Sequence, residues 1–379
     1  MRGHIKKRGK NWSVIIELPK DTITGKRKQK WFTVEGNKSD AEKFLTKKLL
    51  ELDTGILIDT KKMKYSEYLD YWFKEVCIKN LKQTTIDGYK HNIENHIKPI
   101  IGNIYLDKLT PLHLQNLYSK KIDNGKLKKE GGLSKKSVLT IHRIIHRSLG
   151  QAVKWQLIAR NIADSVEPPK PDKYKAKFLN EQQLNILIDK SKDTKLYIPI
   201  LIAIYTGMRR GEILGLKWEN VDLKNGIIKI KQALYSTQNG LEFSTPKTES
   251  SNRNICIPEF LIKELKRYKT RQDKNKLKYG NLYKDTGAIC TLENGNLINP
   301  KSFSRDFHKL LENNNLPLIR FHDLRHTHAS LLVKLGVQPK IISNRLGHSN
   351  ISITMDLYSH VYTESDKSVA NMFEKLLIS

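Results

Sequence analysis

Residues 206–212 read Thr-Gly-Met-Arg-Arg-Gly-Glu and follow a segment, 195–206, that is predicted to be a helix. A glycine at the end of such a helix turns the chain, and Arg209 stands two residues beyond the turn. Guanidinium groups form paired hydrogen bonds with phosphate oxygens, which an ammonium group cannot do. The stretch therefore indicates a phosphate-binding turn after the predicted helix 195–206.

Three further motifs lie between residues 322 and 358. They are His322-Asp323-Leu324-Arg325, Leu346-Gly347-His348, and Tyr358, ten residues after the last histidine. Displacing one oxygen of a phosphodiester by another builds negative charge on the non-bridging oxygens, which Arg209 and Arg325 are placed to neutralise. A phenol with a pKa of about 10 needs a base to take its proton, and His322 or His348 is the candidate.

A lysine is the expected proton donor for the departing 5′-oxygen. Lys247 stands in Ser-Thr-Pro-Lys-Thr at 244–248, a turn between predicted strands, and Lys231 is its rival. Attack by Tyr358 leaves a 3′-phosphotyrosine and a free 5′-hydroxyl. The bond energy is kept, so the strand can be rejoined without ATP.

This series of motifs resembles that of the tyrosine recombinase family, in particular the integrases of temperate phages and conjugative transposons. The resemblance implies that Arg209 and Arg325 hold the scissile phosphate, with Glu212 orienting a basic side chain of the pocket. It also implies that His322 and His348 complete the pocket, that Lys247 is the general acid and that Tyr358 is the nucleophile. No cofactor and no metal ion are implied.

The chain is expected to be a multidomain α+β protein, since its 379 residues exceed what one core usually organises. The expected parts are an arm-type DNA-binding domain (1–58), an all-α core-binding domain (62–166), a Pro- and Lys-rich linker (167–177) and a mostly α catalytic domain with a small sheet and a tail helix (178–379). Helices are predicted near 65–76, 84–97, 111–123, 134–157, 180–191 and 195–206, and strands near 227–232, 241–246 and 254–257.

The first domain is predicted to be a three-stranded sheet backed by one helix. Two strands are expected at 11–18 and 26–34, and a capping box from Ser39 to Glu42 opens the helix. Basic residues crowd the second of these strands and are the candidate DNA contacts: Lys26, Arg27, Lys28 and Lys30. Lysines that guard a solvated edge strand are the alternative.

Composition favours a polyanionic partner. The chain has 68 Lys and Arg against 39 Asp and Glu, a net charge of +29, and its three cysteines form no Cys-x-x-Cys pair. No apolar run suggests a signal peptide or a membrane span. We therefore expect double-stranded DNA as the partner, no membrane and a cytoplasmic location, and the resemblance implies a bacterial host and association with its nucleoid.

Several alternatives remain open at this stage. Tyr362 shares a helical face with Tyr358, and the spacing of His322 and His326 also suits zinc. A catalytically silent DNA-binding protein and a metal-dependent nuclease are the rival functions. The resemblance further implies a homotetramer on core and arm-type DNA sites, with an excisionase and a host DNA-bending protein as candidate partners. The apolar tail stripe from Val369 to Leu377 could dock on its own domain or on a neighbouring subunit.

Overall fold

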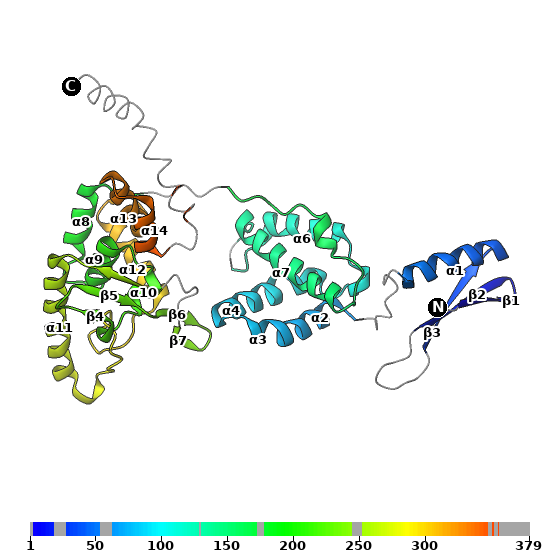
Figure 1. The fold of residues 1–379 in the computed structure, drawn as a ribbon, viewed down its shortest axis with the longest axis horizontal. Helices are drawn as coiled ribbons and strands as arrows, with labels where there is room; N and C mark the ends of the chain where they lie inside the picture. The colour runs from blue at the N-terminus through cyan, green and yellow to red at the C-terminus, as the bar shows by residue number, and fades with distance from the viewer. Residues whose placement is uncertain are drawn as a thin grey trace, which may run out of the picture. The chain divides into compact units, whose positions relative to one another are not determined.

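A computed structural model describes residues 3–18, 28–53, 63–128, 130–172, 178–244 and 252–347, together with 351 and 355. The chain divides into two compact units, Met1–Lys173 and Tyr174–Ser379 (Figure 1). The predicted linker 167–177 contains this division, and its residues 173–177 lie outside the described residues. The mixture of a small N-terminal sheet, a helical part and a largely helical C-terminal unit confirms the predicted α+β class.

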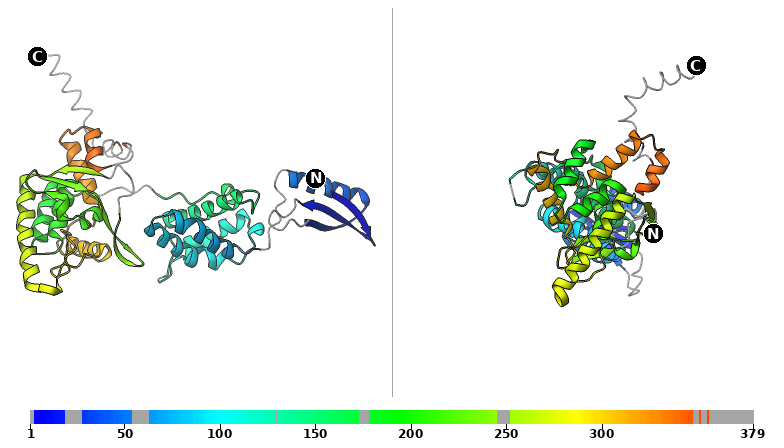
Figure 2. Two further views of the ribbon diagram at one scale, coloured as in Figure 1. Left: turned by 60° about the horizontal axis from the view of Figure 1, so that its bottom comes forward. Right: turned by 90° about the vertical axis from the view of Figure 1, so that its left-hand side faces the viewer.

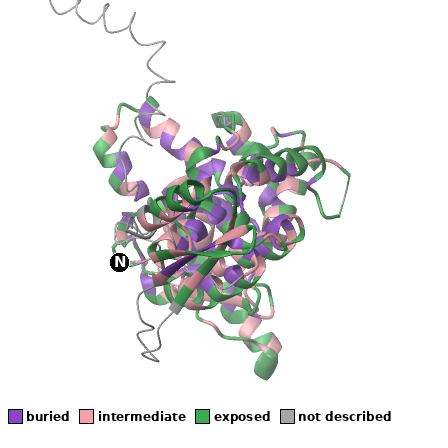
Figure 3. Cartoon of the chain, turned by 90° about the vertical axis from the view of Figure 1, so that its right-hand side faces the viewer, coloured by how far each residue is buried: buried purple, intermediate pink, exposed green. Residues whose placement is uncertain are grey.

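The N-terminal sheet is antiparallel in the order β1-β2-β3, with α1 across one face (Figures 1 and 2). Its elements are β1 (Gly3–Arg8), β2 (Asn11–Leu18), β3 (Lys28–Glu35) and α1 (Lys38–Asp53). The central strand β2 carries four consecutive buried residues, 13–16 (purple in Figure 3). The helix is capped by Asn37 and Asp40, which bond each other's backbone N–H, and not by the predicted Ser39 and Glu42. An amide and a carboxylate two positions earlier fill the same capping geometry.

Two long helical runs follow, and each contains one π turn. The first comprises α2 (Tyr65–Trp72), the π turn Phe73–Cys77 and α3 (Ile78–Asn80); the second comprises α4 (Gln83–Asn92), the π turn Ile93–Ile97 and α5 (Lys98–Ile101). The second run passes the predicted end at residue 97. Lys98 N–H reaches back five residues to the Ile93 carbonyl, and Pro99, which has no N–H to donate, follows inside the continuing helix.

Two further helices, α6 (Pro111–Asn124) and α7 (Lys135–Lys154), complete the core of this helical part. Single 3₁₀ turns lie at Leu106–Lys108 and Ile162–Ser165. As predicted, Pro111 begins α6, and Ser134 caps α7 by accepting the Ser137 N–H at 3.2 Å. Tyr65 and Tyr68 are buried and hydrogen-bond Ser148 of α7, which satisfies their hydroxyl groups inside an apolar core.

The C-terminal unit surrounds the apolar helix α9 with helices and two small sheets. Its helices are α8 (Glu181–Ser191), α9 (Tyr197–Thr206), α10 (Arg210–Leu214), α11 (Glu259–Tyr279), α12 (Pro300–Asn313), α13 (Asp323–Lys334) and α14 (Pro339–Leu346), with 3₁₀ turns at Trp218–Asn220 and Gly280–Leu282. Its strands are β4 (Val221–Asp222), β5 (Ile227–Ile230), β6 (Ala233–Thr237), β7 (Gly240–Ser244) and β8 (Arg253–Cys256). One sheet has the order β4-β5-β8, and β6 and β7 form a separate hairpin.

The strand β6 was absent from the sequence-based prediction, and β7 begins one residue earlier and ends two residues earlier than predicted. Asn239-Gly240, a dipeptide typical of hairpin turns, stands at the β6–β7 turn and was the available signal. The core is continuous from α8 through α9 to α13, and α9 buries seven of its ten residues. Helix α9 therefore gives the turn that follows it a rigid base.

Candidate active site

The turn at Gly207 joins α9 to α10 and packs against two other helices. Gly207 is left-handed, with φ +64° and ψ 18°, and its N–H donates to the Ala203 carbonyl at 2.9 Å. A Cβ atom on Gly207 would lie 2.4 Å from Leu346 Cδ2 and 2.7 Å from His328 Cδ2. The position therefore needs glycine both for its backbone conformation and for its size.

Glu212 anchors the side chain of Arg209, the N-cap residue of α10. The backbone N–H and Nη1 of Arg209 donate to the two carboxylate oxygens of Glu212, each at 2.9 Å. Arg209 Nη2 donates to the Gly347 carbonyl at 2.9 Å. The Glu212 side chain is 3% exposed and that of Arg209 is 37% exposed. The guanidinium is thus fixed on its protein side and accessible on the other.

Arg253, the first residue of β8, belongs to the same group of side chains. Its Nη2 and Nη1 donate to the Glu212 carboxylate at 2.9 and 3.3 Å, and its Nε donates to the Arg345 carbonyl at 2.8 Å. The Arg253 side chain is 7% exposed. No pattern in the sequence marks it, because it stands between two asparagines after a polar stretch. A buried carboxylate at position 212 needs a positively charged partner, and this requirement was the one available signal.

Arg325, on the first turn of α13, completes what we call the arginine cluster: Arg209, Arg253 and Arg325. Its Nη1 donates to the Gly207 carbonyl at 2.8 Å. Its Nη2 is buried and has no hydrogen-bond partner among the residues that the structure describes. An unpaired buried donor is costly, so this atom marks a place for an acceptor that is not among those residues.

The arginine cluster carries more positive charge than Glu212 balances. Burial favours a raised pKa for Glu212, but the charges and hydrogen bonds of Arg253 and Arg209 outweigh it and hold that pKa below its usual value. Burial, together with the charges of Arg209 and Arg253, lowers the pKa of Arg325 to about 9. Three guanidinium groups around one carboxylate form a site that favours a further anion.

His322 immediately precedes α13, and its ring lies close to Arg325. Desolvation, followed by the charge of Arg325, lowers the pKa of His322 to about 4, so the imidazole is neutral near pH 7. The next residue, Asp323, is fully buried and accepts the backbone N–H and Nη2 of Arg320, both at 2.8 Å. This local ion pair fixes the turn that presents His322 and Arg325 together.

A zinc site at His322 and His326 would need a third ligand, and none is placed beside them among the described residues. The rings of His322 and His326 meet edge to face with 5.4 Å between their centroids. Over the same residues, no group of three or more His, Cys, Asp or Glu side chains is placed to hold a metal ion.

His328 and Arg345 join four elements behind the arginine cluster. The Nδ1 of His328 bonds the Ile204 carbonyl at 2.8 Å, and Arg345 Nε donates to His328 Nε2 at 3.3 Å. Arg345 Nη2 donates to the carbonyls of Tyr205 and Cys256 at 2.8 and 3.2 Å. These bonds connect α9, α13, α14 and β8, so the position of α14 depends on both side chains.

Three of the six predicted catalytic residues lie outside the described residues: Lys247, His348 and Tyr358. The alternative nucleophile Tyr362 and the tail do so as well. Lys231, the rival of Lys247, is described and is exposed between β5 and β6. The structure thus brings together Arg209, Glu212 and Arg325 with His322 beside them.

The predicted basic strand is described only in part. Lys26 and Arg27 lie outside the described residues, and Lys28 begins β3, with its side chain not described. Every second residue of a strand lies on the same face, so Lys30 shares its face with Phe32 and Val34, which pack beneath α1. Trp31 is 54% exposed on the opposite face. Lys30 therefore belongs to the covered face of the sheet.

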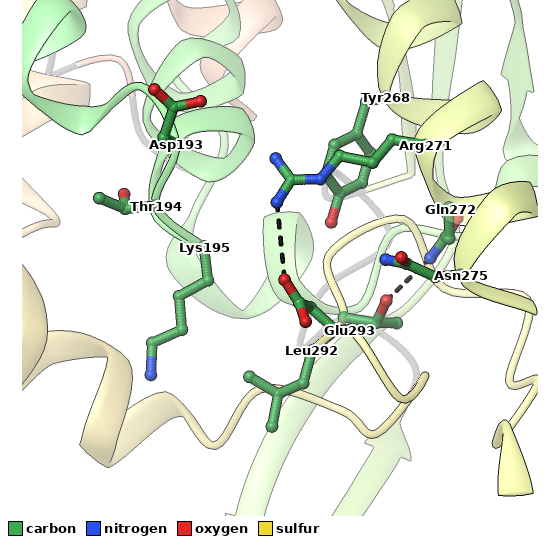
Figure 4. A pocket seen from close by; sticks show the side chains of 10 residues that line it. Asp193, Thr194, Lys195, Tyr268, Arg271, Gln272, Asn275, Leu292 and Glu293 are labelled. Carbon is green, nitrogen blue, oxygen red and sulfur yellow. Dashed lines mark hydrogen bonds and ion pairs between the residues drawn. The ribbon is translucent and has the colours of Figure 1, made fainter. Parts of the chain in front are cut away.

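A cavity of about 220 Å³ lies beside α11, away from these residues (Figure 4). Arg271 and Glu293 form an ion pair across it at 3.7 Å. At its inner side Gln272 donates to Thr291 Oγ1 at 2.8 Å and accepts from Trp218 Nε1 at 2.6 Å. No member of the arginine cluster lines this cavity.

Comparison with known proteins places the chain in a family. The phage integrase family model matches residues 177–365, and the model of the phage integrase N-terminal SAM-like domain matches residues 64–122. Together they cover more than half of the chain. The chain belongs to the phage integrase family.

This integrase is similar to proteins that are known as recombinases. A tyrosine recombinase XerC-like protein of Caldanaerobacter subterraneus is 28% identical over 360 residues, which cover 90% of each chain. The structure of the Tn1549 transposon integrase with a circular intermediate DNA is 21% identical, with a TM-score of 0.67, over 82% of this chain and 99% of that one. A lambda integrase tetramer bound to a Holliday junction is 19% identical, with a TM-score of 0.56, over 91% of this chain and 95% of that one, and shares the fold.

The integrase is a tyrosine recombinase, an enzyme that cleaves and rejoins DNA at specific sites to integrate a mobile element. DNA is accordingly its partner. Over the described residues, no helix combines the length and the apolar character that a membrane span requires.

Proposed function

We propose that Tyr358 is the nucleophile of this recombinase and that Arg209 and Arg325 hold the scissile phosphate. The Nη2 of Arg325, buried and without a partner among the described residues, is the observation that carries the proposal, because it offers a donor beside two further guanidinium groups. A phosphodiester supplies acceptor oxygens for these donors. The phosphate-binding half of the reaction thus rests on described side chains.

In the proposed reaction the Tyr358 oxygen attacks phosphorus and the bond from phosphorus to the 5′-oxygen breaks. The product is a 3′-phosphotyrosine, and the 5′-oxygen leaves as a hydroxyl after it takes a proton from Lys247. The phenol proton passes to His322 or His348. The lowered pKa of His322 supports it as an acceptor, because the ring is neutral near pH 7. Religation reverses these steps with a new 5′-hydroxyl.

We further propose that the open face of the N-terminal sheet contacts arm-type DNA. Lys6 and Arg8 of β1 are exposed, and so are Trp31 and Thr33 of β3. By strand alternation these side chains lie on the face opposite α1, in contrast to Lys30. A sheet face with basic and aromatic groups can enter a DNA groove. Lys26 and Arg27, which directly precede Lys28 in the sequence, remain candidate contacts.

The assembly is proposed to be a homotetramer on core-type and arm-type sites in the cytoplasm of a bacterial host, on nucleoid DNA. The similarity to the lambda integrase, which has been solved as a tetramer on a Holliday junction, supports this. An excisionase and a host DNA-bending protein are proposed as further partners.

A nicked DNA substrate that carries the core site tests the nucleophile. In EDTA the wild type should form a covalent protein–DNA band, Tyr358→Phe should form none, and the matched variant Tyr362→Phe should form it normally. Loss of the band in Tyr362→Phe alone would contradict the assignment. DNA binding without any covalent band would favour the catalytically silent alternative, and hydrolysis that stops in EDTA would favour a nuclease.

A further inference from the structure

Arg253 donates hydrogen bonds to two groups that themselves position parts of the proposed active site. Two of its nitrogens hold Glu212, which in turn holds the backbone and the guanidinium of Arg209. Its third nitrogen, Nε, holds the Arg345 carbonyl near the end of α14. Arg253 is therefore connected to the site on two sides while it is 7% exposed.

The end of α14 depends on arginine donors from outside the helix. The last carbonyls of a helix have no partner within it, and cations near a helix C-terminus are favourable. Here Arg253 occupies the Arg345 carbonyl, and Arg209 occupies the Gly347 carbonyl. Gly347 itself is left-handed, with φ +67°, and ends α14 directly before His348. Both arginines thus hold the chain where it enters the segment that leads to Tyr358.

We propose that Arg253 is a positioning residue that fixes Arg209, through Glu212, and the end of α14 in the arrangement required for strand cleavage. This inference rests on the proposed function. Arg253 would not contact DNA; it would set the geometry of groups that do. A lysine cannot replace it, because one ammonium group lacks the planar fork that bonds a carboxylate and a carbonyl together.

If the ion pair between Arg253 and Glu212 only stabilised the fold, replacing Arg253 would not change the pH dependence of cleavage. Glu212 is surrounded by Arg209, Arg253 and Arg325, and Tyr235 of β6 also lies near it. Without Arg253 the buried carboxylate loses its principal counter-charge and takes up a proton more readily. Protonated Glu212 would then release Arg209, so cleavage by Arg253→Met should fall as the pH is lowered over a range in which the wild type changes little.

The test measures single-turnover formation of the covalent adduct on a nicked substrate, together with DNA affinity and thermal unfolding, from pH 5.5 to 8.5. We expect Arg253→Lys to fold and bind DNA within about threefold of the wild type but to cleave about 100-fold more slowly, as small displacements of reacting groups do. Arg267→Lys, at an exposed arginine that pairs with Glu264, is the matched control and should cleave normally.

The pH profile separates positioning from general stability. Arg253→Met should show the added loss at low pH, and Glu212→Gln combined with Arg253→Met should abolish that pH dependence. Normal cleavage by Arg253→Lys, or parallel pH profiles for Arg253→Met and the wild type, would overturn the inference. If Arg253→Met does not fold, the rate of Arg253→Lys decides. A wild type that forms no adduct at Tyr358 would instead overturn the proposed function and this inference with it.

Discussion

His328 is a buried histidine behind the arginine cluster, and both nitrogens of its ring form hydrogen bonds. His328 is 8% exposed, donates to the Ile204 carbonyl through Nδ1 and accepts from Arg345 through Nε2. Only the neutral ring can do both. Burial, followed by the charge of Arg345, accordingly lowers the pKa of His328 from 6.5 to about 4.

This shift predicts a loss of stability in acid. Between pH 6.5 and 4 the unfolded chain binds a proton at His328 and the folded chain does not, so the free energy of unfolding falls as the pH falls. The contribution is roughly 3 kcal/mol over that window. His328→Asn, which keeps a donor for Ile204, should be less stable at pH 7 and lose less on acidification. Hydrogen exchange of α13 peptides, corrected for intrinsic rates, measures this; equal acid losses in both proteins would contradict it.

At the residue scale, motif order was sufficient to select Arg209, Glu212 and Arg325, since each stands at a turn or a helix start that the sequence marks. Arg253 could not be selected, because its role arises from a contact between β8 and α10. Arg253 and Glu212, which form that contact, are 41 positions apart in the sequence. A lone arginine among asparagines has the sequence appearance of a solvated residue. Its burial is a tertiary property.

At the element scale, the N-terminal sheet has two unlike faces. One face packs beneath α1 through Val14, Ile16 and Phe32. Lys30, which pairs with Ile16, lies on this same face. The other face presents Arg8 and Trp31. Charge along the sequence identified the basic strand but not the face, because the face depends on register and on which side the helix covers.

The two faces predict different effects of removing one positive charge. Arg8→Ala should weaken arm-site binding about tenfold and reduce the salt slope by about 1, as the loss of one phosphate contact does. Lys30→Ala, the matched change on the covered face, should alter affinity less than about threefold. Titrations of arm-site DNA at several salt concentrations measure both. A larger effect at Lys30 than at Arg8 would contradict the assignment of the open face.

Helices were predicted better than strands in this chain. Starts such as Pro111 and Ser134 follow from local capping chemistry, which a sequence displays directly. The π turn before Pro99 and the strand β6 are each only five residues long, so local sequence carries little information about them. Such short elements gain their stability from packing more than from intrinsic preference.

At the scale of the whole molecule, the surplus of 29 positive charges suits a protein that follows the phosphates of long DNA sites. The N-terminal sheet and the helical part that follows it have separate hydrophobic clusters, one around Val14 and Ile16 and one around Trp72. Each therefore has a core of its own on which a separate DNA-binding role can rest.

Deletion of residues 1–58 tests this division of roles. The shortened integrase should still form the covalent adduct at an isolated core site at a rate within about threefold of the full chain, because Gly207, Glu212, Arg345 and Gly347, which hold the arginine cluster, all belong to the C-terminal unit. Recombination of complete element ends, which also requires arm sites, should be lost. Parallel gel assays of both reactions measure this, and equal loss of the two would argue against an arm-reading domain.

The central claim is that a tyrosine at position 358, served by a phosphate site built from Arg209 and Arg325, becomes joined to DNA. Mass spectrometry of the protein–DNA adduct trapped on a nicked core site tests this most directly. We predict a single nucleotide-modified peptide in which Tyr358 carries the 3′-phosphate, and no such peptide from Arg325→Ala. Attachment at Tyr362 or at any other side chain would contradict the account.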